Sequence, residues 1–281
     1  MLIASWNVNS IRSRLLQVIK WLEDEQPDVL CLQETKVSDK EFPYEAFEDI
    51  GYSVKFYGQK TYNGVAIISK IKITDMRYGF SGELNQSEIS EELHLQKRII
   101  SGLINGVRII NVYVPNGSSL DSEKFNYKVN WLAKLKKYMI KQSRRGEPTC
   151  LLGDFNIALS DNDIHSPDKF VGGIMASEIE RQMLREVLGT RFIDSFRVFE
   201  KLSGHWSWWD YRNNSFELNK GWRIDHIYIS KNLLNNLKSS VIERSQRGNN
   251  QPSDHAPVMI NLNFQDDLIK IDDDDDDIFD L

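Results

Sequence analysis

Thr149-Cys150-Leu151-Leu152-Gly153-Asp154-Phe155-Asn156 joins a short, largely apolar run to two polar residues. A run of this kind is typical of a strand that is buried on both faces of a sheet. The glycine permits a sharp turn, after which Asp154 and Asn156 can point the same way. Asp-x-Asn also occurs in ordinary turns, because both side chains bond to the local backbone. The stretch therefore predicts a buried strand that ends in either a pair of site residues or a turn.

Further segments along the chain have the composition of strands. In addition to 149–153, we expect strands at 2–7, 28–33, 54–57, 65–69, 98–104, 107–114, 223–230 and 257–264. Helical spacing marks 11–22 before Pro27, the stripe of Phe125, Val129, Leu132, Leu135 and Met139, and the residues after the capping-box sequence Ser177-Glu178-Ile179-Glu180. Strands outnumber helices, and short turns such as Asn105-Gly106 join some of them. This order predicts an α/β fold with two mixed sheets packed face to face and helices outside, whereas a purely parallel, doubly wound sheet fits less well.

The charge of the chain is unevenly distributed. Its 281 residues carry a formal net charge of −6, but residues 266–281 contain nine Asp and one Lys, which leaves residues 1–265 at +2. A near-neutral body can bind a polyanion when basic side chains gather on one face and a divalent cation adds charge. We expect a single catalytic domain over 1–265 and an acidic, disordered tail over 266–281.

Composition also restricts where the protein works. No run approaches the roughly 18 apolar residues of a membrane span, and the first residues lack the pattern of a signal peptide. We therefore expect an intracellular, cytoplasmic protein that works as a monomer without a membrane. Cys31 and Cys150 lie inside apolar runs, which predicts buried free thiols more strongly than a disulfide.

Oxygen and imidazole ligands follow or precede several predicted strands. They are Asn7, Glu34, Asp154, Asn156, Asp254 and His255. Packed sheets often bring strand ends to a common rim. Carboxylates and carboxamides suit Mg²⁺ or Mn²⁺, and the chain has no cluster of thiolates or histidines that would favour zinc. The pattern predicts one divalent-metal site with Glu34 as the strongest ligand candidate, and the alternative for Glu34 is a surface carboxylate.

Two residues need partners in this arrangement. Asp225 lies in an otherwise apolar predicted strand, where an unpaired carboxylate is costly. Its expected partner is His255, and the alternative is an arginine. The neighbouring Asp254 can also support a positive charge on His255. The other histidines, at 94, 165, 205 and 226, have no comparable setting, and we interpret them as surface or packing residues.

Aromatic residues accompany the polar ones. Tyr113 ends a predicted strand, so its phenol can project into the rim or pack as most tyrosines do. Trp206, Trp208 and Trp209 lie together, and Trp222 follows. Such a group is either core or a set of exposed indoles that stack on bases or line an apolar sugar pocket.

Six motifs in order resemble the exonuclease III family of apurinic/apyrimidinic (AP) endonucleases, within the deoxyribonuclease I-like endonuclease/exonuclease/phosphatase superfamily. They are Ser5-Trp6-Asn7-Val8-Asn9, Leu32-Gln33-Glu34-Thr35-Lys36, Asn111-Val112-Tyr113-Val114-Pro115-Asn116-Gly117, Gly153-Asp154-Phe155-Asn156-Ile157-Ala158, Gly221-Trp222-Arg223-Ile224-Asp225 and Ser253-Asp254-His255-Ala256-Pro257. Six motifs in sequence are specific, although any one could be chance. The resemblance covers 1 to about 264 and implies a four-layer α/β sandwich.

The resemblance also implies an activity in DNA repair. Members cut duplex DNA on the 5′ side of an abasic site and leave a 3′-hydroxyl, and they commonly show 3′-to-5′ exonuclease and 3′-end-cleaning activities. The implied substrates are therefore abasic duplexes and blocked 3′ ends, with Mg²⁺ as cofactor and Mn²⁺ able to replace it.

Residue roles carry over from the same resemblance. Glu34 would bind the metal, with Asn7, Asp154, Asn156, Asp254 and His255 around it. Asp154 would orient or deprotonate water, Asn156 would bond phosphate oxygens, and His255 held by Asp225 would contact the scissile phosphate, with Tyr113 nearby. Trp208, Trp222 and Ile224 match positions that line the family's abasic pocket, and Asn116 would contact DNA.

Two segments depart from the family pattern. The loop Gly117-Ser118-Ser119-Leu120-Asp121 lacks the basic residue that enters DNA in some members, and the stretch 80–96 is acidic. The tail lies outside the resemblance. It is a solvated extension, a peptide that docks on another repair or replication protein, or a segment that weakens nonspecific DNA binding.

Two other functions remain as alternatives. One is a related phosphodiesterase or phosphatase for lipid or inositol phosphates, since such enzymes share the Glu, Asp-x-Asn and Asp-His elements. The tryptophan segment favours DNA. The other is a non-catalytic DNA-binding module, which would leave the acidic centre unexplained because carboxylates repel phosphate unless a cation bridges them.

Overall fold

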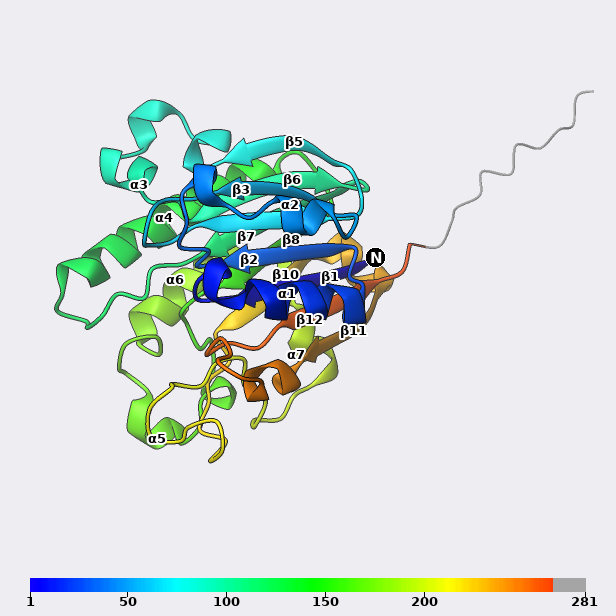
Figure 1. Ribbon diagram of the computed structural model, residues 1–281. Helices are drawn as coiled ribbons and strands as arrows, with labels where there is room; N and C mark the ends of the chain where they lie inside the picture. The colour runs from blue at the N-terminus through cyan, green and yellow to red at the C-terminus, as the bar shows by residue number, and fades with distance from the viewer. Residues whose placement is uncertain (265–281) are drawn as a thin grey trace, which may run out of the picture.

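Apolar strands that are buried on both faces form the middle of two six-stranded sheets (Figure 1). The computed structural model describes residues 1–264. The first sheet has the order β11-β12-β1-β2-β4-β3. Its strands are β1 (Leu2–Asn7), β2 (Val29–Gln33), β3 (Ser53–Tyr57), β4 (Val65–Ser69), β11 (Leu237–Ile242) and β12 (Val258–Leu262). The second sheet has the order β5-β6-β7-β8-β10-β9. Its strands are β5 (Ile73–Tyr78), β6 (Ile99–Ile104), β7 (Val107–Tyr113), β8 (Thr149–Asp154), β9 (Phe192–Asp194) and β10 (Asp225–Ser230).

Each sheet contains one parallel pair among antiparallel neighbours. In the first sheet β1 runs parallel to β2, with Asn7 opposite Gln33. In the second sheet β7 runs parallel to β8, with Tyr113 opposite Asp154. Parallel strands end at the same edge of a sheet. The residues that follow these four strands are therefore brought to two neighbouring edges.

Helices cover both outer faces of the paired sheets (Figure 1). They are α1 (Ile11–Glu25), α2 (Glu45–Glu48), α3 (Glu91–Leu95), α4 (Glu123–Ser143), α5 (Pro167–Phe170), α6 (Glu178–Leu188) and α7 (Ser195–Phe199). Trp21 of α1 packs against the first sheet, while Leu135 of α4 and Leu184 of α6 pack against the second. Residues such as Ile67 and Leu152 form a third core between the sheets. This arrangement is the four-layer α/β sandwich that the sequence predicts.

A buried amide joins the two sheets below the strand ends. The Asn111 side chain on β7 donates to the carbonyls of Leu32 and Ala66, each at 2.9 Å. Its Oδ1 accepts from Gln33 Nε2 at 2.7 Å, and Gln33 also donates to Ser5 Oγ at 3.0 Å. Buried polar groups that are paired in this way fix a relative position that apolar packing alone leaves less defined. The network therefore sets how the two edges face each other.

The predicted strands are all present, with ends shifted by up to two residues or so. The strand predicted at 223–230 begins at Asp225, and the strand predicted at 257–264 is observed at 258–262. Three strands, β5, β9 and β11, were not predicted. Cys31 and Cys150 are buried free thiols, as expected. The predicted tail, 266–281, lies outside the described residues. Within 1–264, no helix has both the length and the apolar composition for crossing a bilayer.

The acidic stretch 80–96 is partly neutralised by basic side chains. Glu83 accepts from Arg145 Nε at 3.0 Å and pairs with Arg77, although its side chain is almost completely buried. Glu88 pairs with Lys141 of α4 at 2.8 Å. Burial and two arginines account for Glu83 as part of the interior, whereas Glu88 forms a partly exposed ion pair with α4.

Candidate active site

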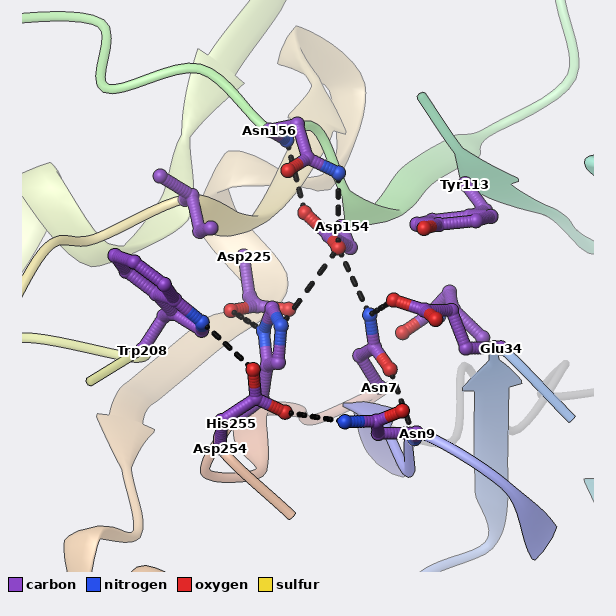
Figure 2. Close-up of polar contacts among 12 residues, drawn as sticks. Asn7, Asn9, Glu34, Tyr113, Asp154, Asn156, Trp208, Asp225, Asp254 and His255 are labelled. Carbon is purple, nitrogen blue, oxygen red and sulfur yellow. Dashed lines mark hydrogen bonds and ion pairs between the residues drawn. The ribbon is translucent and has the colours of Figure 1, made fainter. Parts of the chain in front are cut away.

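The ends of five strands converge on one group of polar side chains (Figure 2). Asp154 is the last residue of β8 and lies between Tyr113 at the end of β7 and Asp225 at the start of β10. Asn7 ends β1, and Glu34 directly follows β2. The site is therefore built from both sheets, with Asp154 and Asp225 inside strands and Glu34 directly after one.

Gly153 places Asp154 but does not make the turn that we expected there. Its φ is +139°, and a Cβ at this position would lie 1.9 Å from the carbonyl oxygen of Val112. Only glycine allows β8 to approach β7 so closely. The turn comes later, where Asn156 adopts φ +49°. Glu34 also has a positive φ, of +50°, and such conformations in non-glycine residues cluster at functional sites.

Glu34, Asp154 and His255 form the centre of the group. One ligand atom of each lies within 4.8 Å of the others. The Asn7 side chain lies between the two carboxylates and donates to Glu34 Oε1 and Asp154 Oδ2, both at 2.9 Å. Lys36 pairs with the other side of Glu34, 2.8 Å from Oε2. Burial raises the pKa of Glu34, but the charge of Lys36 and the bond from Asn7 together lower it below its usual value.

His255 is held by Asp225 at the base of the site. Its Nδ1 lies 2.8 Å from Asp225 Oδ2, and its Nε2 lies 3.9 Å from Asp154 Oδ2. Burial alone would lower the pKa of His255, but the negative charges of Asp225 and Asp154 raise it to about 10. The imidazole is therefore a cation at neutral pH. The second oxygen of Asp225 is buried without a partner, and the backbone N–H of Asp225 donates to Ser207 Oγ at 3.0 Å.

Asp154 is buried, accepts hydrogen bonds from Asn7 and Asn156, and lies near other carboxylates. Its Oδ1 accepts from the Asn156 backbone N–H at 2.8 Å, and its Oδ2 accepts from Asn156 Nδ2 at 3.1 Å. Burial raises the pKa of Asp154 to about 7; His255 opposes this, while Asp225 and Glu34 add to it. Near neutral pH this carboxyl is poised to lose or gain a proton. Such values are common at catalytic sites.

The donor set fits a divalent cation with a preference for oxygen. Two carboxylates lie close enough to share one ion, and a single imidazole is the only nitrogen ligand in the cluster. Mg²⁺ and Mn²⁺ favour this combination, whereas zinc sites usually contain more histidine or cysteine. The proximity of Glu34 and Asp154 also raises the pKa of Asp154. A bound cation would relieve that repulsion.

Asp254 lies beside this centre, outside the group of three ligand atoms that lie within 4.8 Å of one another. Its Oδ1 accepts from Asn9 Nδ2 at 3.0 Å, and its Oδ2 accepts from Trp208 Nε1 at 2.9 Å. Burial raises the pKa of Asp254, while the charge of His255 and these two bonds lower it below its usual value. Each oxygen of Asp254 thus accepts one hydrogen bond. The bond from Trp208 connects Asp254 to a residue that lines a hollow beside the site (Figure 2).

Tyr113 lies on the side of Asp154 that is away from His255 (Figure 2). Figure 2 shows its hydroxyl directed toward the space between Asp154 and Glu34. Burial and the negative charge of Glu34 raise the pKa of Tyr113 well above its usual value, so the phenol keeps its proton. The guanidinium of Arg98 lies over the ring, 4.6 Å from its centre. Tyr113, Arg98 and Asn116 line a polar hollow of about 620 Å³.

A second hollow, of about 660 Å³, lies on the Trp208 side of the site. Trp208 and Trp222 line it together with Phe170 and Met175. Ile224 does not line it, because this side chain is buried behind Trp222 in a small apolar cluster. The pocket role expected of Ile224 stays a prediction, since its side chain packs with Trp222 and Met175, which line the hollow. Its N–H donates to Ser207 Oγ, which supports the backbone beside Asp225.

The tryptophan segment is mostly core. Trp206 and Trp209 are buried and pack with Ala256, while Trp208 remains partly exposed at the hollow. The side chains of this irregular segment therefore point in different directions, into the core or toward the hollow. One residue of the segment therefore faces the site, and its neighbours hold it there.

Several residues of the site escaped the sequence analysis. They are Asn9, Lys36, Arg98, Phe170, Met175 and Ser207. Lys36 lies two residues after Glu34, so the motif itself contained a signal. Phe170 and Met175 lie in an irregular segment with no periodicity. Only the tertiary fold brings them to Trp222.

Comparisons with known proteins agree with this geometry. The model of the endonuclease/exonuclease/phosphatase family matches residues 4–255. Exodeoxyribonuclease III of Haemophilus influenzae is 35% identical over 266 residues, which span 90% of this chain and 97% of that protein. An AP endonuclease from Archaeoglobus fulgidus superimposes with a TM-score of 0.87 and 36% identity, covering 94% of this chain and all of the other. The 3′ phosphatase NExo from Neisseria, bound to a product DNA hairpin, gives a TM-score of 0.88 and 39% identity over the same shares.

These matches extend over nearly the whole described chain. The chain therefore belongs to the endonuclease/exonuclease/phosphatase family. Within this family its similarity is to the exonuclease III and AP endonuclease group, as the six motifs indicate.

Proposed function

We propose that the protein is a DNA repair nuclease that hydrolyses the phosphodiester bond on the 5′ side of an abasic site in duplex DNA. The observation that carries this proposal is the convergence of Glu34, Asp154 and His255 within 4.8 Å beside the apolar hollow of Trp208 and Trp222. The first feature suits phosphate chemistry, and the second suits a sugar without a base. Relatives named as an exodeoxyribonuclease, a 3′ phosphatase and an AP endonuclease support additional 3′-to-5′ exonuclease and 3′-end-cleaning activities.

The metal part of the proposal assigns Mg²⁺, with Mn²⁺ as a substitute. Glu34 and Asp154 would hold the ion, with His255 and the amides of Asn7 and Asn156 around the same centre. When bound, the ion would offset the negative charge of the phosphate and of these carboxylates. Asp254 would act at the edge of this centre, because its oxygens already accept two hydrogen bonds.

The side chains of the site then divide the hydrolysis among them. Asp154 orients a water molecule and accepts its proton as the water oxygen bonds to phosphorus. His255, kept cationic by Asp225, donates to a phosphate oxygen as negative charge develops. Asn156 and Tyr113 add further donors near the phosphate. The P–O3′ bond breaks and its oxygen takes a proton from solvent water, which leaves a 3′-hydroxyl on one fragment and a 5′-phosphate on the abasic fragment.

Substrate choice is assigned to the two hollows beside the carboxylates. Trp208 and Trp222 offer apolar walls to a deoxyribose that lacks a base. Extruding such a nucleotide breaks no base pair, so it saves the few kcal/mol that flipping a paired base requires. Asn116 and Arg98 on the other side would contact the DNA backbone. We assign the whole activity to a single catalytic domain, 1–265, working as a monomer in the cytoplasm.

A lipid or inositol phosphate substrate is the rival for the same chemistry. The hollow of Trp208 is lined by the apolar side chains of Trp222, Phe170 and Met175 and also by Lys169 and Lys220, so its lining alone does not reject this rival; the similarity to DNA nucleases favours DNA. A DNA-binding module without catalysis would not require Glu34 and Asp154 to face each other in a buried centre. The DNA nuclease is therefore the function that the geometry supports best.

One assay tests this proposal. A duplex with a single abasic-site analogue is incubated with the protein, once with Mg²⁺ and once with a chelator. The expected result is one incision on the 5′ side of the analogue in the presence of Mg²⁺ and none with chelator. Equal cutting of an intact duplex, or equal cutting with chelator, would reject the proposed lesion preference or metal dependence.

A further inference from the structure

A buried ion pair lies behind the site, between α4 and α6. Lys128 Nζ lies 2.5 Å from Glu180 Oε1, and both side chains are completely buried. Lys128 occupies the buried face of α4 together with Phe125 and Leu132, where an apolar residue would be the ordinary choice. A buried pair of this kind gives little net stability compared with apolar residues of similar size. Its position therefore needs an explanation other than the strength of the core.

The hydrogen bonds of Lys128 reach two loops of the site. Its ammonium donates to the carbonyl of Asn156 at 2.8 Å and to the carbonyl of Asn116 at 3.0 Å. Asn156 is held at φ +49°, and it is the residue whose N–H and side chain both donate to Asp154. The Asn116 side chain in turn donates to Asn156 Oδ1 at 3.0 Å. Lys128 therefore holds the peptide that follows Asn156, and a shift of this residue would disturb both of its bonds to Asp154.

Glu180 extends the same connection to the second hollow. Its carboxylate accepts from the Met175 N–H at 3.0 Å and from Ser177 Oγ at 2.6 Å. Met175 lines the hollow of Trp208 and Trp222, and its carbonyl accepts from the Ala158 N–H at 2.8 Å. One ion pair therefore fixes three irregular segments that carry the phosphate side and the sugar side of the site.

We propose that Lys128 and Glu180 are positioning residues that hold the Asn156 loop in the geometry needed for cleavage. Neither residue touches the substrate, and both act through the backbone of the loops that do. This proposal rests on the nuclease activity proposed above. A small displacement of a reacting group lowers the rate by about 100-fold. Loss of the pair should therefore lower kcat by about 10- to 100-fold and change KM little.

The test compares a double variant with a matched pair on the same helices. Lys128→Met/Glu180→Gln removes both charges and keeps an acceptor at residue 180. Lys136→Met/Glu186→Gln breaks an exposed pair between α4 and α6, 2.9 Å apart, that touches no loop of the site. Single-turnover and steady-state rates are measured on the abasic duplex below the unfolding temperature of each variant. The first variant should lose kcat as stated, the second should match the wild type, and Lys128→Arg, which keeps donors and charge, should retain most activity.

Hydrogen exchange gives a second measurement that needs no substrate. Without the pair, the backbone amides of 154–158 should exchange faster than in the wild type, while those of β7 and β8 should be unchanged. Wild-type kcat together with unchanged exchange in Lys128→Met/Glu180→Gln would overturn the inference. An equal loss in Lys136→Met/Glu186→Gln would also overturn it, because any weakening of the α4–α6 contact would then suffice. If the wild type itself fails to cut the abasic duplex, the proposed function fails, and the exchange result still decides the positioning role.

Discussion

At the scale of single residues, the charge of His255 depends on one buried partner. Asp225 lies 2.8 Å from its Nδ1 and provides the largest influence that raises the pKa of this imidazole. Replacing a carboxylate that orients a functional histidine typically costs 10- to 100-fold in activity. Asp225→Asn should therefore reduce turnover on an abasic duplex by roughly a hundredfold, while His255→Ala added to it should reduce turnover little further, because the two residues act as a unit. The check is kcat of both single variants and of the double variant, with exposed Asp24→Asn as the control.

Losses that multiply in the double variant would show instead that Asp225 and His255 act independently.

The sequence indicated which residues belong to the site. Asp225 in an apolar strand required a partner, and the structure places His255 there. The directions of Asp254 and Ile224 could not be read, because each depends on how an irregular segment folds back. Asp254 turns to Asn9 and Trp208, and Ile224 turns into a small core.

At the scale of elements, the buried strands were predictable, and of the four edge strands only β3 was. β2, β4 and β8 are buried along their whole length, so they appear as continuous apolar runs. β5 and β11 lie at sheet edges, expose much of their length, and contain register shifts, so no apolar pattern marks them. The short β9 offers too few residues for any period. Strand pairing, and not local composition, creates these three strands.

The contact between the sheets gives a prediction for stability. Asn111→Ala removes the amide that donates to the buried carbonyls of Leu32 and Ala66 and the acceptor of Gln33, whose amide keeps its bond to Ser5. Such losses cost about 2 kcal/mol in the free energy of unfolding. Urea unfolding should show this decrease, whereas Asn126→Ala on the exposed face of α4 should change stability by less than about 0.5 kcal/mol. Equal effects of the two substitutions would mean that the Asn111 network contributes no more than a surface amide.

At the scale of the whole molecule, the distribution of charge should control nonspecific binding to DNA. Residues 266–281 carry −8, so their removal changes the formal charge of the protein from −6 to +2. We expect the variant that ends at 265 to bind undamaged duplex more tightly at low salt and to show a steeper loss of affinity as salt rises. Titrations of labelled duplex at several salt concentrations measure both quantities. Identical affinity and slope would reject a role for the tail in DNA binding and leave the solvated extension or the docking peptide.

The proposed activity requires that Glu34, Asp154 and His255, which are distant in sequence, form one divalent-metal site. The most direct test of this site is a titration of the protein with Mn²⁺, followed by electron paramagnetic resonance, for the wild type, Glu34→Gln, Asp154→Asn and the exposed control Glu45→Gln. We expect saturable binding to the wild type and to the control, and at least about tenfold weaker binding to the other two variants, since each loses a charged ligand. Unchanged Mn²⁺ affinity in both Glu34→Gln and Asp154→Asn would contradict this expectation.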